Sequence, residues 1–208
     1  MTHEHDHGHD HGHEHDHGGG HDHGDAELDY AAQVEAYRAD KDAFFKGSPS
    51  SPIPHDGRHD FGGLPYFPVD EALRFEDLAL EPYAGDQPSS FQIPTSDGQL
   101  RPAHRAGTLT FAIGGAPHRL TGYMLDGGDA ESLFVPFLDT TSGHETYGAG
   151  RYLDLEPELD GTYVLDFNLA YHPSCVYDPT YSCPLTPAEN RLPVRIEAGE
   201  RLANDATA

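Results

Sequence analysis

The sequence is poor in basic residues and in long apolar runs, and each shortage excludes a class of protein. Only 12 Lys and Arg accompany 36 Asp and Glu, which gives a formal net charge of −24 at pH 7. Nucleic acids and anionic membrane surfaces both attract clustered basic side chains, so neither partner is expected. No segment reaches the roughly 18 apolar residues of a membrane helix, and the polar N-terminus does not resemble a signal peptide. We therefore expect a soluble, cytoplasmic protein.

Lysine is scarcer still, because Lys41 and Lys46 are the two lysines of the chain and the other ten bases are arginines. Excess carboxylate with little lysine is typical of proteins from a salt-rich cytoplasm. Salt at high concentration screens charges over a few ångströms and so removes their mutual repulsion. The composition favours a halophilic source over ordinary acidic drift.

The N-terminal segment contains ten of the 16 histidines, nearly all alternating with Asp, Glu or Gly. With almost no apolar residue to bury, residues 1–25 are expected to be a disordered tail. Imidazole suits zinc and nickel, and neighbouring carboxylates concentrate cations, so the tail is predicted to buffer divalent transition metals with low specificity. The alternatives are a solubilising tail or an engineered tag. The candidate ligands are His3, His5, His7, His9, His11, His13, His15, His17, His21 and His23.

The rest of the chain indicates one mainly β domain with a leading helix. Apolar residues at helical spacing predict a helix over residues 26–47, with Asp25 as its N-cap. Residues 48–202 then contain about eight short alternating segments separated by glycine turns. They include a first segment at 73–80 that a bulge interrupts, a hairpin that turns at Gly114-Gly115, and a segment at 192–197. We expect an antiparallel β-barrel or β-sandwich with long polar loops, followed by a short C-terminal tail at 203–208.

Two loops, 139–154 and 166–190, are rich in polar and special residues, and their motifs resemble a known family. The matching blocks are Lys41-Asp42, Phe44-Phe45, Ser51-Pro52, Thr141-Ser142-Gly143, Glu145-Thr146-Tyr147, Gly150-Arg151-Tyr152-Leu153-Asp154, Asp166-Phe167-Asn168, Ala170-Tyr171, Pro173, Cys175, Cys183-Pro184-Leu185, Asn190 and Ala198-Gly199-Glu200. On these blocks, about residues 30–202 resemble the domain of unknown function 1684 family. That resemblance implies a single domain, and it carries no activity because the family has none established.

The residues themselves favour a small anionic ligand. Free amides of the Gly148–Gly150 segment beside the Arg151 guanidinium would complement a carboxylate or phosphate. Further hydrogen bonds would come from Tyr147, Tyr152, Asp166 and Asn168. The alternative is that Arg151 pairs internally with Glu145, Asp154 or Asp166 and holds the loops against the β domain.

The two cysteines, Cys175 and Cys183, leave three interpretations open. They are structural thiols, a redox-sensitive pair, or zinc ligands together with His172 and a fourth partner such as His144 or Asp178. Their spacing matches no standard zinc finger or ribbon.

Enzymatic activity is the competing class of function. Cys175 with a histidine base would be a nucleophile, and Glu145 with another carboxylate would serve general acid–base hydrolysis. Neither arrangement has diagnostic spacing, and the loops also fit a purely structural or interaction domain. The leading hypothesis is a binding protein without catalysis, whose oligomeric state the sequence does not indicate.

Overall fold

The computed structural model describes residues 29–127 and 132–203, and it begins with one long helix. Helix α1 (Tyr30–Gly47) starts where the Asp29 side chain accepts a hydrogen bond from the Ala32 amide at 2.8 Å. Aspartate in that position satisfies an amide that the helix itself leaves free. The predicted cap Asp25 lies outside the described residues, and the helix begins four residues later than expected. Its end at Gly47 agrees with the prediction.

In the part of the chain that the structure describes, seven strands follow the helix, most of them within the segments whose residues alternate in the sequence. In chain order they are β1 (Arg74–Leu78), β2 (Ser90–Pro94), β3 (Leu100–Ile113), β4 (Ala116–Leu125), β5 (Leu133–Phe137), β6 (Arg151–Leu155) and β7 (Tyr163–Asp166). Single turns of 3-10 helix occupy His55–Gly57, Glu71–Leu73, Phe167–Leu169, Ser174–Val176 and Ala188–Asn190.

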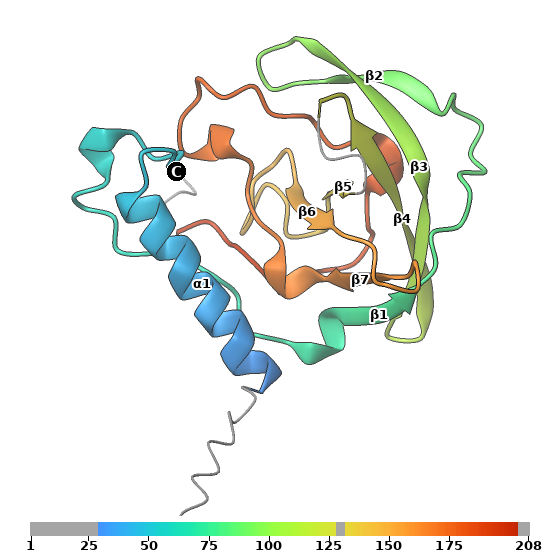
Figure 1. The fold of residues 1–208 in the computed structure, drawn as a ribbon, viewed down its shortest axis with the longest axis horizontal. Helices are drawn as coiled ribbons and strands as arrows, with labels where there is room; N and C mark the ends of the chain where they lie inside the picture. The colour runs from blue at the N-terminus through green and yellow to red at the C-terminus, as the bar shows by residue number, and fades with distance from the viewer. Residues whose placement is uncertain (1–28, 128–131, 204–208) are drawn as a thin grey trace, which may run out of the picture.

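The strands form two antiparallel sheets. Five of them pair in the order β2-β3-β4-β5-β6, and β1 pairs with β7 in a second, two-stranded sheet (Figure 1). The expected hairpin is present, since β3 and β4 pair from Ile113↔Ala116 onward around Gly114 and Gly115. Both glycines have positive φ, a conformation that this tight turn requires and that other residues rarely adopt.

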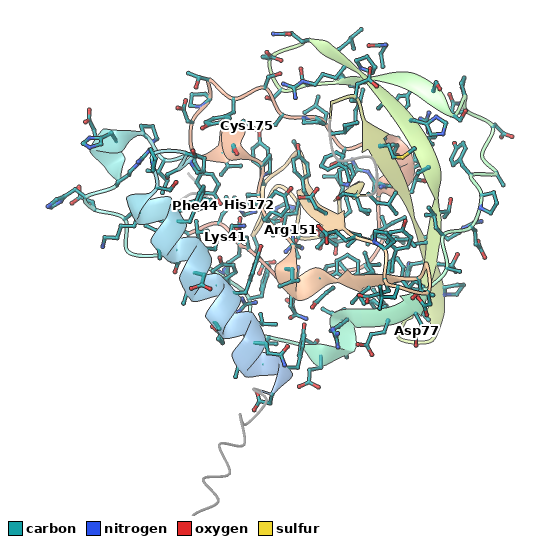
Figure 2. All side chains as sticks on the ribbon, in the orientation of Figure 1. Lys41, Phe44, Asp77, Arg151, His172 and Cys175 are labelled. Carbon is teal, nitrogen blue, oxygen red and sulfur yellow. The ribbon has the colours of Figure 1, made fainter. Side chains whose placement is uncertain are left out.

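The expected irregularity in the first strand is also present. Pairing of β1 with β7 shifts register between Phe75 and Leu78, and Asp77 within that interval has a φ of +54°. A β-bulge of this kind re-aims the side chains that follow it. In Figure 2, Asp77 lies at the outer edge of the sheet, far from α1.

The observed fold is therefore mainly β, but its larger sheet does not close on itself. Within the described residues, β2 and β6 are the two ends of the five-stranded order and do not pair with each other. The barrel alternative is not confirmed, and the open sheets resemble a sandwich more closely.

The segment at 192–197 is not a strand, which corrects the prediction. Its alternating residues do point inward, with Leu192 and Ile196 buried. Its backbone bonds only in part to other backbone. The Leu192 amide donates to the Leu138 carbonyl at 2.7 Å, and the Val194 carbonyl accepts from the Thr140 amide at 3.0 Å. Beyond Val194, side chains take over: the Ile196 amide donates to Asp139 Oδ2 at 2.8 Å, and the Ile196 carbonyl accepts from Arg151 Nη2 at 2.8 Å. Buried polar side chains thus interrupt the ladder of backbone hydrogen bonds that alternation alone implies.

The core lies between the sheets and beneath the C-terminal segment. Its centre is aromatic, with Phe167 contacting Phe75, Phe111 and Phe137 at ring-centroid distances of 6.2, 5.6 and 5.1 Å. Within the part of the chain described, no helix has the length and apolarity to cross a membrane.

Candidate functional site

A groove of about 680 Å³ is lined by residues of helix α1 and of strands β6 and β7. This size suits a small organic molecule. Its walls are mainly apolar and aromatic, with carboxylates among the lining. The lining residues are Tyr30, Gln33, Val34, Tyr37, Arg74, Ser132, Leu153, Asp154, Leu155, Glu156, Glu158, Val164, Asp166, Leu169 and Tyr171.

Helix α1 contributes one face to this groove. Tyr30, Gln33, Val34 and Tyr37 recur at intervals of three and four residues, which places them on the same side of a helix. Val34 is buried against the β domain, whereas the Tyr37 ring is 45% exposed. The helix thus supplies both part of the apolar floor and an accessible aromatic ring.

The start of α1 is fixed to strand β7 by a buried polar cluster. The Tyr30 hydroxyl donates to Asp166 Oδ2 at 2.7 Å and accepts from Asn168 Nδ2 at 2.8 Å. Asn168 also binds the backbone of Asp70 through both ends of its amide. Burial and the adjacent Asp166 carboxylate raise the pKa of Tyr30, so the phenol stays protonated and keeps donating.

A second buried cluster fixes the other half of the helix. Lys41 Nζ pairs with Glu200 Oε1 at 2.6 Å, and Glu200 is 1% exposed. The second carboxylate oxygen accepts from the Tyr177 hydroxyl at 2.9 Å and the His172 amide at 2.7 Å. Two motif blocks from opposite ends of the chain, Lys41-Asp42 and Ala198-Gly199-Glu200, therefore meet here. With both halves of α1 fixed, the groove is preformed.

His172 is placed for structure rather than for proton transfer. Its Nε2 accepts from the Tyr147 amide at 3.2 Å, and its Nδ1 lies 3.6 Å from Glu200 Oε2. Burial, reinforced by the charges of Arg151 and Lys41, lowers the pKa of His172 to about 3. The imidazole is neutral at pH 7, and its acceptor nitrogen is already occupied.

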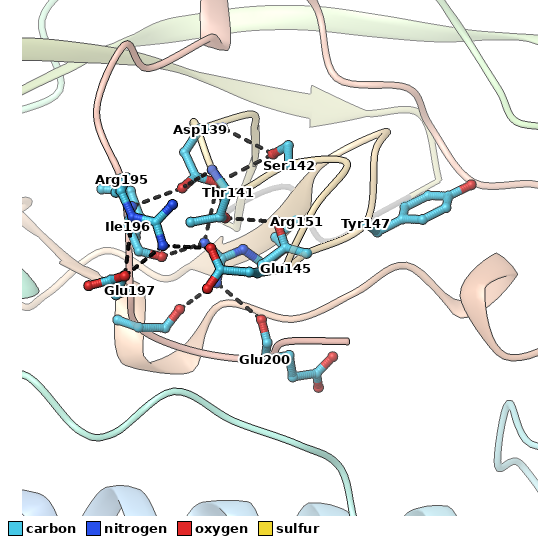
Figure 3. Close-up of polar contacts among 12 residues, drawn as sticks. Asp139, Thr141, Ser142, Glu145, Tyr147, Arg151, Arg195, Ile196, Glu197 and Glu200 are labelled. Atoms are coloured by element: carbon cyan, nitrogen blue, oxygen red, sulfur yellow. Dashed lines mark hydrogen bonds and ion pairs between the residues drawn. The ribbon is translucent and has the colours of Figure 1, made fainter. Parts of the chain in front are cut away.

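Arg151 is fully buried and binds the C-terminal segment (Figure 3). Nη1 donates to the carbonyls of Ala198 and Glu200, and Nη2 donates to the Ile196 carbonyl and lies 3.4 Å from Asp139 Oδ1. Burial lowers the pKa of Arg151 to about 10, which still leaves it charged at neutral pH. This arrangement favours the loop-holding alternative, with Asp139 as the partner in place of Glu145, Asp154 or Asp166.

Gly150, which directly precedes Arg151, likewise bonds within the protein. The Gly150 amide donates to the Tyr147 carbonyl at 3.0 Å. Gly150 has a φ of +105°, and a Cβ there would lie 2.5 Å from the Phe137 carbonyl oxygen. Glycine at this position lets the loop approach β5, and its amide is not free for an anion.

The other predicted ligand and catalytic residues are distributed around the molecule. The Tyr152 hydroxyl is buried and donates to the Pro184 carbonyl. Glu145 pairs with the exposed Arg195 at 2.5 Å. Asp154 and Asp166, in contrast, both line the groove beside α1. The structure thus brings the two aspartates to one cavity but places Arg151 elsewhere.

The cysteines are free thiols next to each other. The Cys175 amide donates to Cys183 Sγ at 3.3 Å, and Cys175 Sγ lies 4.0 Å from the Tyr147 hydroxyl. Burial raises the pKa of Cys183 to about 11, which disfavours the thiolate that a metal or a nucleophilic reaction needs. Across residues 29–127 and 132–203, no three His, Cys, Asp or Glu side chains are arranged to hold a metal ion. The ten histidines of the tail lie outside these residues.

Sequence reasoning missed most of the groove. Its tyrosines come from α1 and from the segment after β7, and Glu156 and Glu158 follow β6. The helical spacing of Tyr30, Val34 and Tyr37 was the available signal, but the same spacing is typical of a face that packs directly on a core.

The fold and the groove define a mainly β domain with a preformed cavity under its N-terminal helix. The family described as "Protein of unknown function (DUF1684)" matches residues 59–201, and the chain belongs to this family. It is also similar to a solved structure, the solution NMR structure of the uncharacterized protein from gene locus rrnAC0354 of Haloarcula marismortui. The two are 39% identical with a TM-score of 0.63, over 85% of this chain and 96% of that one. No curated protein matches the chain.

Proposed function

We propose that this protein binds a small organic molecule in the groove between α1 and strands β6 and β7. The observation that carries the proposal is the groove itself, about 680 Å³ in volume and lined mainly by apolar and aromatic side chains. Binding sites for small molecules are commonly concave, preformed and apolar, with a few polar groups that orient the ligand. The two polar clusters that fix α1 support a site of this kind.

This proposal replaces the anion site expected around Arg151. A ligand there would have to displace the three carbonyl groups and the Asp139 carboxylate that the guanidinium already binds. Removing one partner from a buried ion pair typically costs about 3–5 kcal/mol. The groove needs no such rearrangement.

A direct test blocks the groove without disturbing the core. Val164 is half-buried on β7 and lines the groove, so Val164→Trp should fill it. Leu100, which is 62% exposed and outside the lining, provides the matched control Leu100→Trp. A fragment panel containing cations, anions and neutral molecules is screened by ligand-observed NMR. We expect hits that Val164→Trp abolishes and Leu100→Trp keeps; hits insensitive to Val164→Trp would refute the groove as the site.

We also propose that the histidine-rich tail binds zinc or nickel. Ten histidines alternating with carboxylates support loose, exchangeable coordination. A variant lacking residues 1–24 should lose most nickel and zinc uptake in calorimetric titrations, while its circular dichroism spectrum in the far ultraviolet stays that of a β domain. Survival of the full metal stoichiometry would contradict this role.

Hydrolysis remains the alternative function. Asp154 and Asp166 on the groove wall are the carboxylates that would support it, and turnover of an ester, amide or glycoside that is lost in Asp154→Asn would favour it. The cysteine-based version has less support, because the His172 acceptor nitrogen is bound to the Tyr147 amide.

We further propose a salt-rich cytoplasm as the setting. The net charge of −24 and the scarcity of lysine support high salt, and two cysteines held as free thiols fit a reducing compartment.

A further inference from the structure

The charges that line the groove are mostly negative. Asp154, Glu156, Glu158 and Asp166 contribute four carboxylates, while Arg74 is the one base among the lining residues. This imbalance matters because a cavity lined by one sign of charge selects ligands of the other sign.

Arg74 is already neutralised by its neighbours. Its Nη1 pairs with Glu76 Oε1 at 2.6 Å, and its Nε lies 3.8 Å from Asp166 Oδ2. Its guanidinium also lies over the Tyr30 ring, 5.0 Å from the centroid. With a carboxylate on either side and a ring beneath it, Arg74 offers little positive charge to a ligand.

Two bases of helix α1 are already paired with carboxylates outside the groove lining. Lys41 pairs with the buried Glu200 at 2.6 Å, and Arg38 pairs with Glu35 at 3.1 Å. Lys41 Nζ also lies 4.7 Å from the ring centroid of Tyr171, a lining residue, but the Glu200 carboxylate neutralises its charge.

Glu156 and Glu158 are the carboxylates left available. Both are exposed, and no side-chain ion pair or hydrogen bond engages either of them within the described residues. Asp154 next to them accepts a hydrogen bond from the Tyr171 hydroxyl at 2.5 Å. The lining of the same groove includes Tyr37, which is 45% exposed. A carboxylate and an accessible aromatic ring both attract an ammonium group, through ion pairing and cation–π attraction.

We infer that the groove takes an amphipathic amine: an apolar or aromatic body that packs on the groove wall, with an ammonium group at Glu156, Glu158 and Tyr37. This rests on the proposed function of the groove and names the class of its ligand. Charge complementarity disfavours a small anion as the ligand of this groove.

The test uses three probes that share an indole body and differ in charge: tryptamine, the neutral indole-3-ethanol and the anionic indole-3-propionate. Each is titrated calorimetrically into the full chain at pH 7. We expect tryptamine to bind at least about tenfold more tightly than indole-3-propionate, since each favourable contact of the ammonium is worth a substantial part of a tenfold step. Its affinity should fall as sodium chloride rises from about 0.05 to about 0.5 M.

The variant Glu156→Gln/Glu158→Gln should weaken tryptamine several-fold and leave indole-3-ethanol unchanged. The control Asp56→Asn/Asp86→Asn removes the same charge from two exposed residues outside the groove and should weaken neither.

The outcomes separate the inference from the function beneath it. Tighter binding of indole-3-propionate, or equal binding of tryptamine and indole-3-ethanol, would overturn the amine inference while leaving the groove as a binding site. Binding of none of the three overturns the inference, and a fragment panel without any hit sensitive to Val164→Trp overturns the proposed function as well.

Discussion

Replacing Arg151 by alanine tests how the C-terminal segment is held. The change leaves the Asp139 carboxylate, which is 4% exposed, without its cation, and it removes the donor of the Ile196, Ala198 and Glu200 carbonyls. Removing one member of a buried ion pair costs about 3–5 kcal/mol, and a buried acceptor that loses its donor costs about 1–3 kcal/mol. Asp139 keeps its hydrogen bonds from Thr141 and the Ile196 amide. These costs are not additive, because one side chain makes all of the lost contacts. We therefore expect a loss of about 4–6 kcal/mol, a large share of the about 5–15 kcal/mol typical of a domain.

The assay is urea unfolding followed by circular dichroism, with Arg195→Ala as the matched control. Arg195 also makes two short ion pairs, to Glu145 at 2.5 Å and Glu197 at 2.6 Å, but its side chain is 48% exposed. Exposed pairs contribute about 0–1 kcal/mol, so this variant should unfold almost like the parent chain.

If Arg151→Ala does not fold, the variant Arg151→Lys serves in its place. Lysine keeps a positive charge near Asp139 but supplies one nitrogen where three carbonyls need donors, so this variant should fold with reduced stability. Similar losses for Arg151→Ala and Arg195→Ala would refute the reasoning. A well-folded Arg151→Ala that loses ligand binding would return the site to the loop around Arg151.

Two further predictions concern titratable groups. The pKa of His172 is lowered from 6.5 to about 3, so between these values the unfolded chain binds a proton that the folded chain does not. Stability should then fall as pH drops through that window, by up to about 1.4 kcal/mol per pH unit from this residue. In the variant His172→Gln, the midpoint of urea unfolding should change less with pH between 6.5 and about 3 than in the parent chain. An unchanged slope would contradict this role of His172. The pKa of Cys183 near 11 leaves about one thiolate in a thousand at pH 8. A Cys175→Ser variant leaves Cys183 as its one cysteine, and a chromogenic disulfide reagent measures how fast that thiol reacts. The reaction should be at least about 100-fold slower in the folded protein than in the protein unfolded by urea; equal rates would show an accessible thiolate.

Local sequence signals predicted the elements that a short stretch of the chain specifies. The glycine turn at Gly114 and Gly115 joins two strands that are adjacent in the sequence. The bulge in β1 follows from a local break in alternation, although the partner strand β7 lies about 90 residues further along the chain. The segment at 192–197 failed for the opposite reason. The side chains that bind its backbone at Ile196, Asp139 and Arg151, lie about 45 to 57 residues earlier in the chain. Nothing in its alternating pattern indicates that they interrupt its pairing with residues 138–140.

The candidate site was less predictable than the fold. Reasoning from loop composition selected Arg151, because a guanidinium beside glycines resembles an anion site. Its burial depends on the C-terminal segment folding over it, which no local pattern reveals. Asp166 was selected for the wrong partner, since it binds Tyr30 of helix α1. Only the packing of that helix against β6 and β7 brings Tyr37, Asp154 and Glu156 to one groove.

The most direct test of the groove is a two-dimensional 1H–15N NMR titration of the full chain with the strongest binder from the fragment panel, whatever its charge. If the groove is the site, the largest shifts will fall on the N-terminal half of α1 and on the lining residues 153–156, 158, 164, 166, 169 and 171. Shifts concentrated on residues 139–151, with those of α1 unchanged, would place the ligand at the Arg151 loop and contradict a site under the helix.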